Sequence, residues 1–217
     1  MFRRQKKNAI KDLQTHVVEY ADVIVDLAEE LGNMYEASLS GDPEKVKTSW
    51  NKFEELNKET DKREKDLLPT EGSISGIYSS VAIDQIHLII YMEDLGDSIL
   101  ELGRTISRMM LKELNAKKEM LDGVFKILEE IIFKTCNAVK ILYEDYSKAF
   151  ELTKQVEELR NKAREYEIDL IAEYYERAKE LGLKDWIFLS SLLKRIVGVA
   201  EAGEHATDYI ELFALKH

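Results

Sequence analysis

Apolar residues recur along positions 13–34 at alternating spacings of four and three, the heptad pattern of a helix that packs along one seam. The seam consists of Leu13, Val17, Tyr20, Ile24, Leu27, Leu31 and Met34. A second seam, each member 108 residues after its counterpart, consists of Leu121, Phe125, Leu128, Ile132, Thr135, Val139 and Leu142. Because connecting loops can have any length, this agreement predicts that one helical unit occurs twice in the chain.

Turn-forming residues divide the first unit into three helices. The first helix is predicted to end near residues 40–41, with Asp42 as the N-cap of the next helix and Pro43 at its first position. This second helix is expected to stop at Pro69, because proline lacks a backbone donor and disrupts a helix interior. After a loop-like stretch, a third helix is expected over about residues 77–111.

The second unit follows the same plan. A turn is expected near residues 147–151, Gly182 suits a helix C-cap, and a last helix is expected from about residue 185 to the C-terminus. Residues 1–114 and 115–217 are therefore assigned to two three-helix units packed as one elongated domain. The predicted fold class is all-α, with six long antiparallel helices arranged as two repeated three-helix bundles.

Composition agrees with long helices and narrows the partners. The chain has only two prolines, 34% charged and 45% hydrophobic residues, which is typical of a folded helical protein without a membrane span. Its net charge of −11 disfavours nucleic acid and favours cations or a basic partner surface. The single cysteine, Cys136, lies in an apolar helical stretch and is predicted to be a buried small hydrophobe.

The first seven residues are locally basic in this acidic chain. They carry charge but no following apolar segment, so they do not read as a signal peptide, and a cytoplasmic location is expected. Two interpretations stay open for this segment: a solvated helix start, or contact with a membrane surface or a transporter loop.

Candidate chemistry lies in acidic residues that share the interval of 108. Four of them in the first unit, and their counterparts in the second, are Glu59, Asp61, Glu93 and Asp97, then Glu167, Asp169, Glu201 and His205. Helical geometry places Glu93 and Asp97 about 40° apart and nearly opposite the apolar stripe of their helix. Glu201 and His205 are placed in the same way. Side chains four apart can close on one ion, and carboxylates with imidazole suit iron, manganese or zinc.

Two other interpretations compete with a metal site. Acidic residues on an outer helical face are ordinarily just solvated, which would make the protein a metal-free helical adaptor. Asp84 and His87 have the i, i+3 spacing of the ligand motif in ferritin-like di-iron proteins, but their counterparts, Leu192 and Arg195, do not repeat it. A hydrogen-bonded histidine is therefore the preferred interpretation of His87.

A family resemblance appears at the third helix. Met92-Glu93-Asp94-Leu95-Gly96-Asp97-Ser98-Ile99 resembles the Glu-x-x-Gly-Asp stretch of the PhoU-like phosphate-transport regulators. Glu201-Ala202-Gly203-Glu204-His205-Ala206-Thr207-Asp208 is similar to a diverged copy of it. The basic start resembles the branch of the family that is paired with Pit-type phosphate transporters, and the two three-helix units resemble the family over the whole chain.

The resemblance implies a non-enzymatic regulator of inorganic phosphate transport, cytoplasmic or at the inner face of the membrane. Its implied partner is a phosphate transporter or the signalling partner of one, with homo-oligomer formation left open. It also implies divalent or ferric metal ions, with iron, zinc and manganese as the candidates, bound at the bundle surface. The implied ligands are Asp61, Glu93 and Asp97 in the first unit and Asp169, Glu201 and His205 in the second, where His205 replaces the aspartate of the family pattern.

Overall fold

The structure, a computed structural model, is built of helices. It describes residues 2–74, 80–108, 110–113, 118–176 and 182–216, without the side chains of 2–10, 12, 61, 63–74, 80–82, 113 and 118–120. The long helices are α1 (Phe2–Ser40), α2 (Pro43–Ile74), α3 (Ser80–Ser107), α4 (Lys118–Leu142), α5 (Tyr146–Glu176) and α6 (Leu183–Lys216), with a short 3-10 turn, η1, at Leu111–Glu113. These ranges contain no strand, and the predicted all-α class with six helices is confirmed.

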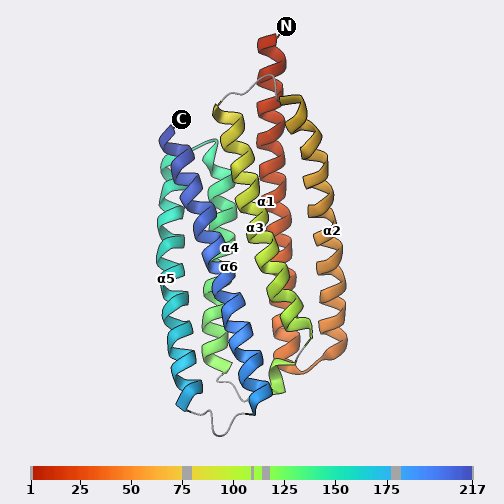
Figure 1. The fold of residues 1–217 in the computed structure, drawn as a ribbon, viewed down its shortest axis with the longest axis vertical. Helices are drawn as coiled ribbons and strands as arrows, with labels where there is room; N and C mark the ends of the chain where they lie inside the picture. The colour runs from red at the N-terminus through yellow and green to blue at the C-terminus, as the bar shows by residue number, and fades with distance from the viewer. Residues whose placement is uncertain (1, 75–79, 109, 114–117, 177–181, 217) are drawn as a thin grey trace.

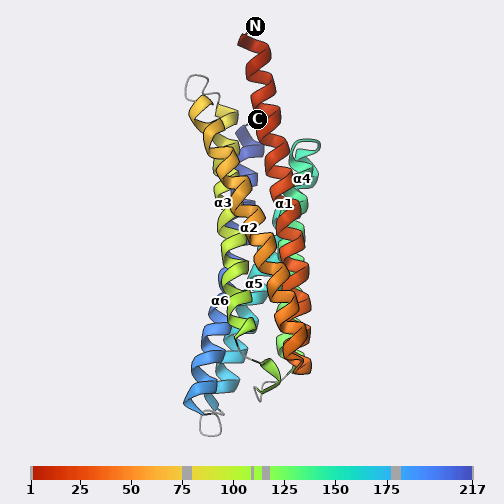
Figure 2. The ribbon, with the colours of Figure 1, turned by 90° about the vertical axis from the view of Figure 1, so that its right-hand side faces the viewer.

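The helices form one elongated bundle (Figures 1 and 2). Within the halves, α1 packs against α2 and α3, and α4 packs against α5 and α6. The halves meet where α1 packs against α4 and α3 packs against α6. Both figures show the first turns of α1 extending beyond the other helices. No helix in the described part of the chain is long and apolar enough to cross a bilayer.

Both heptad seams predicted from the sequence face the core. All fourteen seam positions, seven on α1 and seven on α4, are buried. Cys136 on α4 is fully buried as well, and burial raises the pKa of its thiol to about 12. The thiol is therefore protonated at neutral pH, and the prediction of a buried small hydrophobe is confirmed.

The two helical hairpins begin their second helices with the same cap. Asp42 Oδ1 accepts a hydrogen bond from the backbone N–H of Lys45 at 3.1 Å, and Asp145 Oδ1 accepts one from Lys148 at 3.1 Å. The first turn also contains Gly41, whose φ of 74° lies in the left-handed region that glycine adopts without strain. The predicted end of the first helix and the Asp42 cap are confirmed.

The interval between these caps differs from the one in the sequence pattern. Asp42 and Asp145 are 103 residues apart, not 108. Measured from its cap, Asp61 lies 19 residues along α2, whereas Asp169 lies 24 residues along α5. Five residues of helix correspond to about 7.5 Å, so these two residues are not at equivalent heights. A heptad pattern repeats nearly unchanged after a shift of about one turn, which explains how seams matched at the longer interval.

Three predicted boundaries are wrong. Helix α2 continues through Pro69 to Ile74, since the fixed φ of proline is itself helical and only one backbone bond is lost near the helix end. Residues 147–151 lie in the first turns of α5 because Asp145 caps that helix. Gly182 precedes α6, and its carbonyl accepts the N–H groups of Asp185 and Trp186, so it begins a helix rather than ending one.

Candidate functional site

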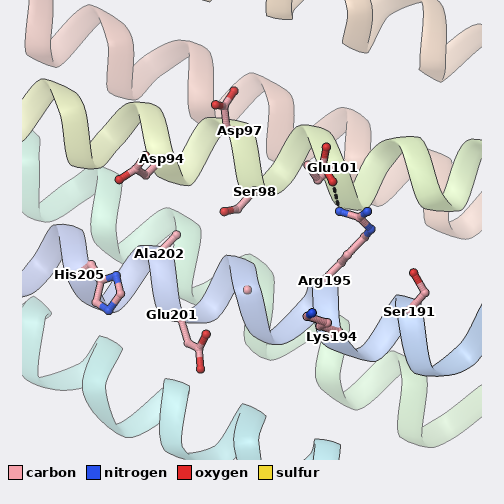
Figure 3. A pocket seen from close by; sticks show the side chains of 11 residues that line it. Asp94, Asp97, Ser98, Glu101, Ser191, Lys194, Arg195, Glu201, Ala202 and His205 are labelled. Carbon is pink, nitrogen blue, oxygen red and sulfur yellow. Dashed lines mark hydrogen bonds and ion pairs between the residues drawn. The ribbon is translucent and has the colours of Figure 1, made fainter.

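A groove of about 660 Å³ runs between α3 and α6 (Figure 3). Its lining residues are Asp94, Asp97, Ser98 and Glu101 from α3, and Ser191, Lys194, Arg195, Gly198, Glu201, Ala202 and His205 from α6. The two helices are antiparallel there, because Asp94 lies near His205 at one end and Glu101 meets Arg195 at the other. The sequence-predicted residues Asp97, Glu201 and His205 thus share one groove.

Two glycines let the groove helices pack closely on their other sides. A Cβ on Gly96 would lie 3.5 Å from the Tyr20 hydroxyl oxygen of α1, so this face of α3 rests on α1. On α6, a Cβ on Gly203 would lie 2.6 Å from Ile131 Cγ2 of α4. His205 follows two residues later, about 200° further round the helix, and therefore points away from α4.

The predicted metal ligands in the groove do not converge on one point. Figure 3 shows the Asp97 carboxylate pointing away from α6, and the Glu201 carboxylate pointing away from α3. Glu201 Oε1 lies 3.9 Å from Arg164 Nη1 of α5. Among the described residues, no three Asp, Glu, His or Cys side chains are arranged to hold a metal ion. In this arrangement the donor set does not fit a metal ion.

The other predicted ligands lie elsewhere. Glu93 is half-buried on α3 and does not line the groove, and Asp169 is exposed on α5 and does not line it either. The side chain of Asp61 lies outside the described ones. The sequence predicted one ligand set on the outer face of each unit. The structure instead places members of both sets on the two sides of one groove, because α3 and α6 pack against each other.

One end of the groove is cationic, which the sequence interpretation missed. A second cavity of about 390 Å³ is lined by Glu101, Arg104, Thr105, Arg108, Phe188, Ser191 and Arg195. It adjoins the groove, because Glu101, Ser191 and Arg195 line both. We call the set of Arg104, Arg108, Lys194 and Arg195 the cationic end, and the set of Asp94, Asp97, Glu201 and His205 the acidic end. The i, i+4 spacing of Arg104 and Arg108 was the available signal, but only helix pairing brings them toward α6.

A further acidic pair on α6 was also missed. Glu204 and Asp208 have the Glu-x-x-x-Asp spacing and face α5, where Glu204 Oε2 lies 2.8 Å from Arg160 Nε. Burial raises the pKa of Glu204 although Arg160 opposes the shift. Burial, followed by the charge of Glu211, raises the pKa of Asp208. These carboxylates are therefore part of the α5–α6 contact.

The i, i+3 pair of Asp84 and His87 joins α3 to α6. The Tyr209 hydroxyl donates a hydrogen bond of 2.8 Å to Asp84, which is 4% exposed, and lies 3.0 Å from His87 Nδ1. Lys216 Nζ donates to the same Asp84 oxygen at 2.8 Å. The interpretation of His87 as a hydrogen-bonded histidine is confirmed. The pair connects two helices instead of forming half of a di-iron site.

Comparison with known proteins gives no match by sequence and a clear match by fold. No protein-family model and no curated protein matches the sequence. Two crystal structures from Shewanella oneidensis MR-1, a PhoU-like protein and a protein described as a PhoU-like phosphate regulatory protein, are each 15% identical to this chain. Each matches with TM-scores of 0.77 and 0.76, respectively, over 94% of this chain and 100% of the other.

A third similar structure is the phosphate transport system regulatory protein PhoU from Streptococcus pneumoniae. It is 14% identical and matches with a TM-score of 0.73 over 98% of both chains. Identities this low carry the fold and not the ligands or partners. The six helices, their order and their packing over nearly the whole chain are those of the PhoU-like fold.

Proposed function

We propose that this protein is a non-enzymatic regulator of inorganic phosphate transport that acts in the cytoplasm, at or near the inner face of the membrane. The observation that carries the proposal is the fold similarity to PhoU-like proteins, one of them described as a phosphate transport system regulatory protein. The similarity spans both halves, so it is more specific than that of a common helical hairpin. A phosphate transporter, or the signalling partner of one, is the proposed binding partner.

The basic N-terminal segment supports a contact with a transporter or the membrane surface. Residues 3–7 contain four Arg or Lys residues, and this part of α1 extends beyond the other helices (Figures 1 and 2). A cationic segment that protrudes from an acidic bundle is suited to anionic lipid or to an acidic cytoplasmic loop. On this basis we assign the protein to the branch that serves Pit-type transporters.

Metal binding enters the proposal through Asp97, Glu201 and His205, because these three line the same groove. Binding one ion requires Asp97 and Glu201 to turn toward His205 from the orientations in Figure 3. Iron, zinc and manganese fit that donor chemistry. The competing proposal is a metal-free adaptor, and it is favoured by the arrangement of the described Asp, Glu, His and Cys side chains, which form no group able to hold a metal.

The transport proposal is tested in the source organism. Deleting the chromosomal copy is expected to change the uptake of radiolabelled phosphate severalfold, in cells grown with low and with high external phosphate. Supplying the wild-type chain from a plasmid should restore the original uptake. Unchanged uptake under both conditions would reject a role in phosphate transport, whatever the chain binds in solution.

The metal proposal is tested separately, by elemental analysis of the purified chain after reconstitution with iron, zinc or manganese. The double variant Asp97→Ala with His205→Ala should lose the metal that the wild type holds. Glu165→Ala, which removes an exposed acid of α5 outside the groove, should keep it. A wild type without metal would leave the adaptor, whereas oxygen-dependent turnover of bound iron would favour a ferritin-like enzyme.

A further inference from the structure

The cationic end of the α3–α6 groove gathers positive charge from two parts of the chain. Arg104 lies in the last turn of α3 and Arg108 follows that helix, while Lys194 and Arg195 come from the interior of α6. Arg104 and Arg108 are four residues apart, so they lie on one side of the chain. The antiparallel pairing of α3 and α6 brings both pairs to the same end of the groove (Figure 3).

These four cations have one nearby carboxylate in the cavity lining, Glu101. Arg195 Nη1 forms an ion pair with Glu101 Oε2, and Arg104 Nη1 lies 3.6 Å from Glu101 Oε1. In the described part of the chain, Arg108 and Lys194 have no ion-pair or hydrogen-bond partner. Positive charge is therefore left over at this end, in a chain whose net charge is −11.

Helix ends account for only part of this charge. The dipole of α3 is negative at its C-terminus, which favours Arg104 and Arg108 there. No such effect applies to Lys194 and Arg195, which lie eleven and twelve residues after the start of α6. Like charges in one cavity repel one another, and an anion between them would relieve that repulsion.

Hydroxyl groups complete the lining. Ser191 lies between the two cavities, and Thr105 lies between the arginines of α3. The Thr105 hydroxyl donates to the Glu101 backbone carbonyl at 3.0 Å, while Ser191 has no hydrogen-bond partner within the described ranges. Guanidinium forks, an ammonium and a hydroxyl donor are the groups that recognise tetrahedral oxyanions. The carboxylates of the acidic end repel an anion and confine it to the cationic end.

We propose that the cationic end is a binding site for a phosphate group, with Arg108 and Lys194 as its principal cationic ligands. The proposal rests on the proposed function only in naming phosphate among tetrahedral oxyanions. The same chemistry is offered by inorganic phosphate and by the terminal phosphate of a nucleotide. A phosphate regulator with this site would sense the occupancy of the groove at the contact between its two halves.

The test is equilibrium dialysis of the full chain at low ionic strength with radiolabelled inorganic phosphate in one arm and radiolabelled ATP in the other. The test variant combines Arg108→Ala with Lys194→Ala, which leaves the ion pair of Glu101 with Arg195 in place. The control combines Lys47→Ala with Lys162→Ala, two exposed cations outside both cavities. The two double variants lose the same charge, so they differ only in position. Circular dichroism checks that each is folded.

Saturable binding near one phosphate per chain is expected for the wild type and the control, with an affinity at least about tenfold lower for the test variant. Binding in the ATP arm alone, with the same loss, would support the site and identify a nucleotide as the source. No binding by the wild type at millimolar concentration, or equal losses in both double variants, would overturn the proposal. A deletion strain with altered phosphate uptake would leave the proposed function standing in that case.

Discussion

The close approach of α4 and α6 makes a sharp prediction about two glycines of α6. A Cβ added at Gly198 would meet nothing within 4 Å, whereas one added at Gly203 would lie 2.6 Å from Ile131 Cγ2. Replacing a glycine in a helix interior with alanine stabilises the helix by about 1 kcal/mol when the site has room. Gly198→Ala should therefore stabilise the protein by about 0.5–1 kcal/mol.

Gly203→Ala gains the same helix propensity but meets a rigid neighbour. The favourable separation of two carbon atoms is about 3.5–4.0 Å, so the contact would be too short by about 1 Å. Ile131 is fully buried, and its Cγ2 is attached to a branched Cβ that keeps one strongly preferred rotamer in a helix. Such overpacking costs about 1–3 kcal/mol. We expect Gly203→Ala to be less stable than Gly198→Ala by about that amount.

Urea denaturation followed by far-ultraviolet circular dichroism measures this difference. The two variants should have similar m-values and different midpoints. In an Ile131→Ala background, which removes Cγ2, the difference between Gly203→Ala and Gly198→Ala should largely disappear. Equal midpoints in the wild-type background would refute the close contact of α6 with α4 at this point.

Three other predictions follow from buried and charged groups. The Cys136 thiol, whose pKa burial raises to about 12, should not react with a thiol reagent at pH 8 until the chain is unfolded by denaturant. Asp208→Asn should raise the free energy of unfolding at neutral pH by about 0.2–0.5 kcal/mol, because it removes a like-charge interaction on the helix. Since the raised pKa of Asp208 means that the folded state disfavours its ionised form, this gain should shrink as the pH falls through the folded pKa and vanish below about 3.9, the unfolded value. A gain that grows on acidification would contradict that sign. Tyr209→Phe removes a donor from buried Asp84 and should cost about 1–3 kcal/mol in a denaturant titration, whereas Tyr91→Phe, which keeps an aromatic ring stacked on Tyr209, should cost less.

The boundary errors show where local signals stop being sufficient. Asp42 was recognised as a cap because proline and glycine lie beside it, whereas Asp145 has neither neighbour and was missed. Pro69 was taken as a stop, but one missing backbone donor near a helix end is a small loss for a helix of 32 residues. Capping by a single carboxylate depends on local geometry that a sequence pattern only partly specifies.

The site shows a different limit. Asp97, Glu201 and His205 were all named from their helical spacing, and their exposed or half-buried positions agree with the predicted side of each helix. Spacing along one helix gives no information on which other helix lies beside it. Arg108 and Lys194 are 86 residues apart and carry no shared motif, so their joint position was not accessible to that reasoning.

The sequence by itself determined the helical class, the two buried seams and the inert Cys136, because backbone hydrogen bonding and a period of 3.5 residues are local properties. It did not determine the interval between the two halves, since a heptad seam is nearly unchanged by a shift of one turn. Only the tertiary structure decided that α3 and α6 lie side by side. That contact converts two separate outer faces into one groove, with carboxylates at one end and cations at the other.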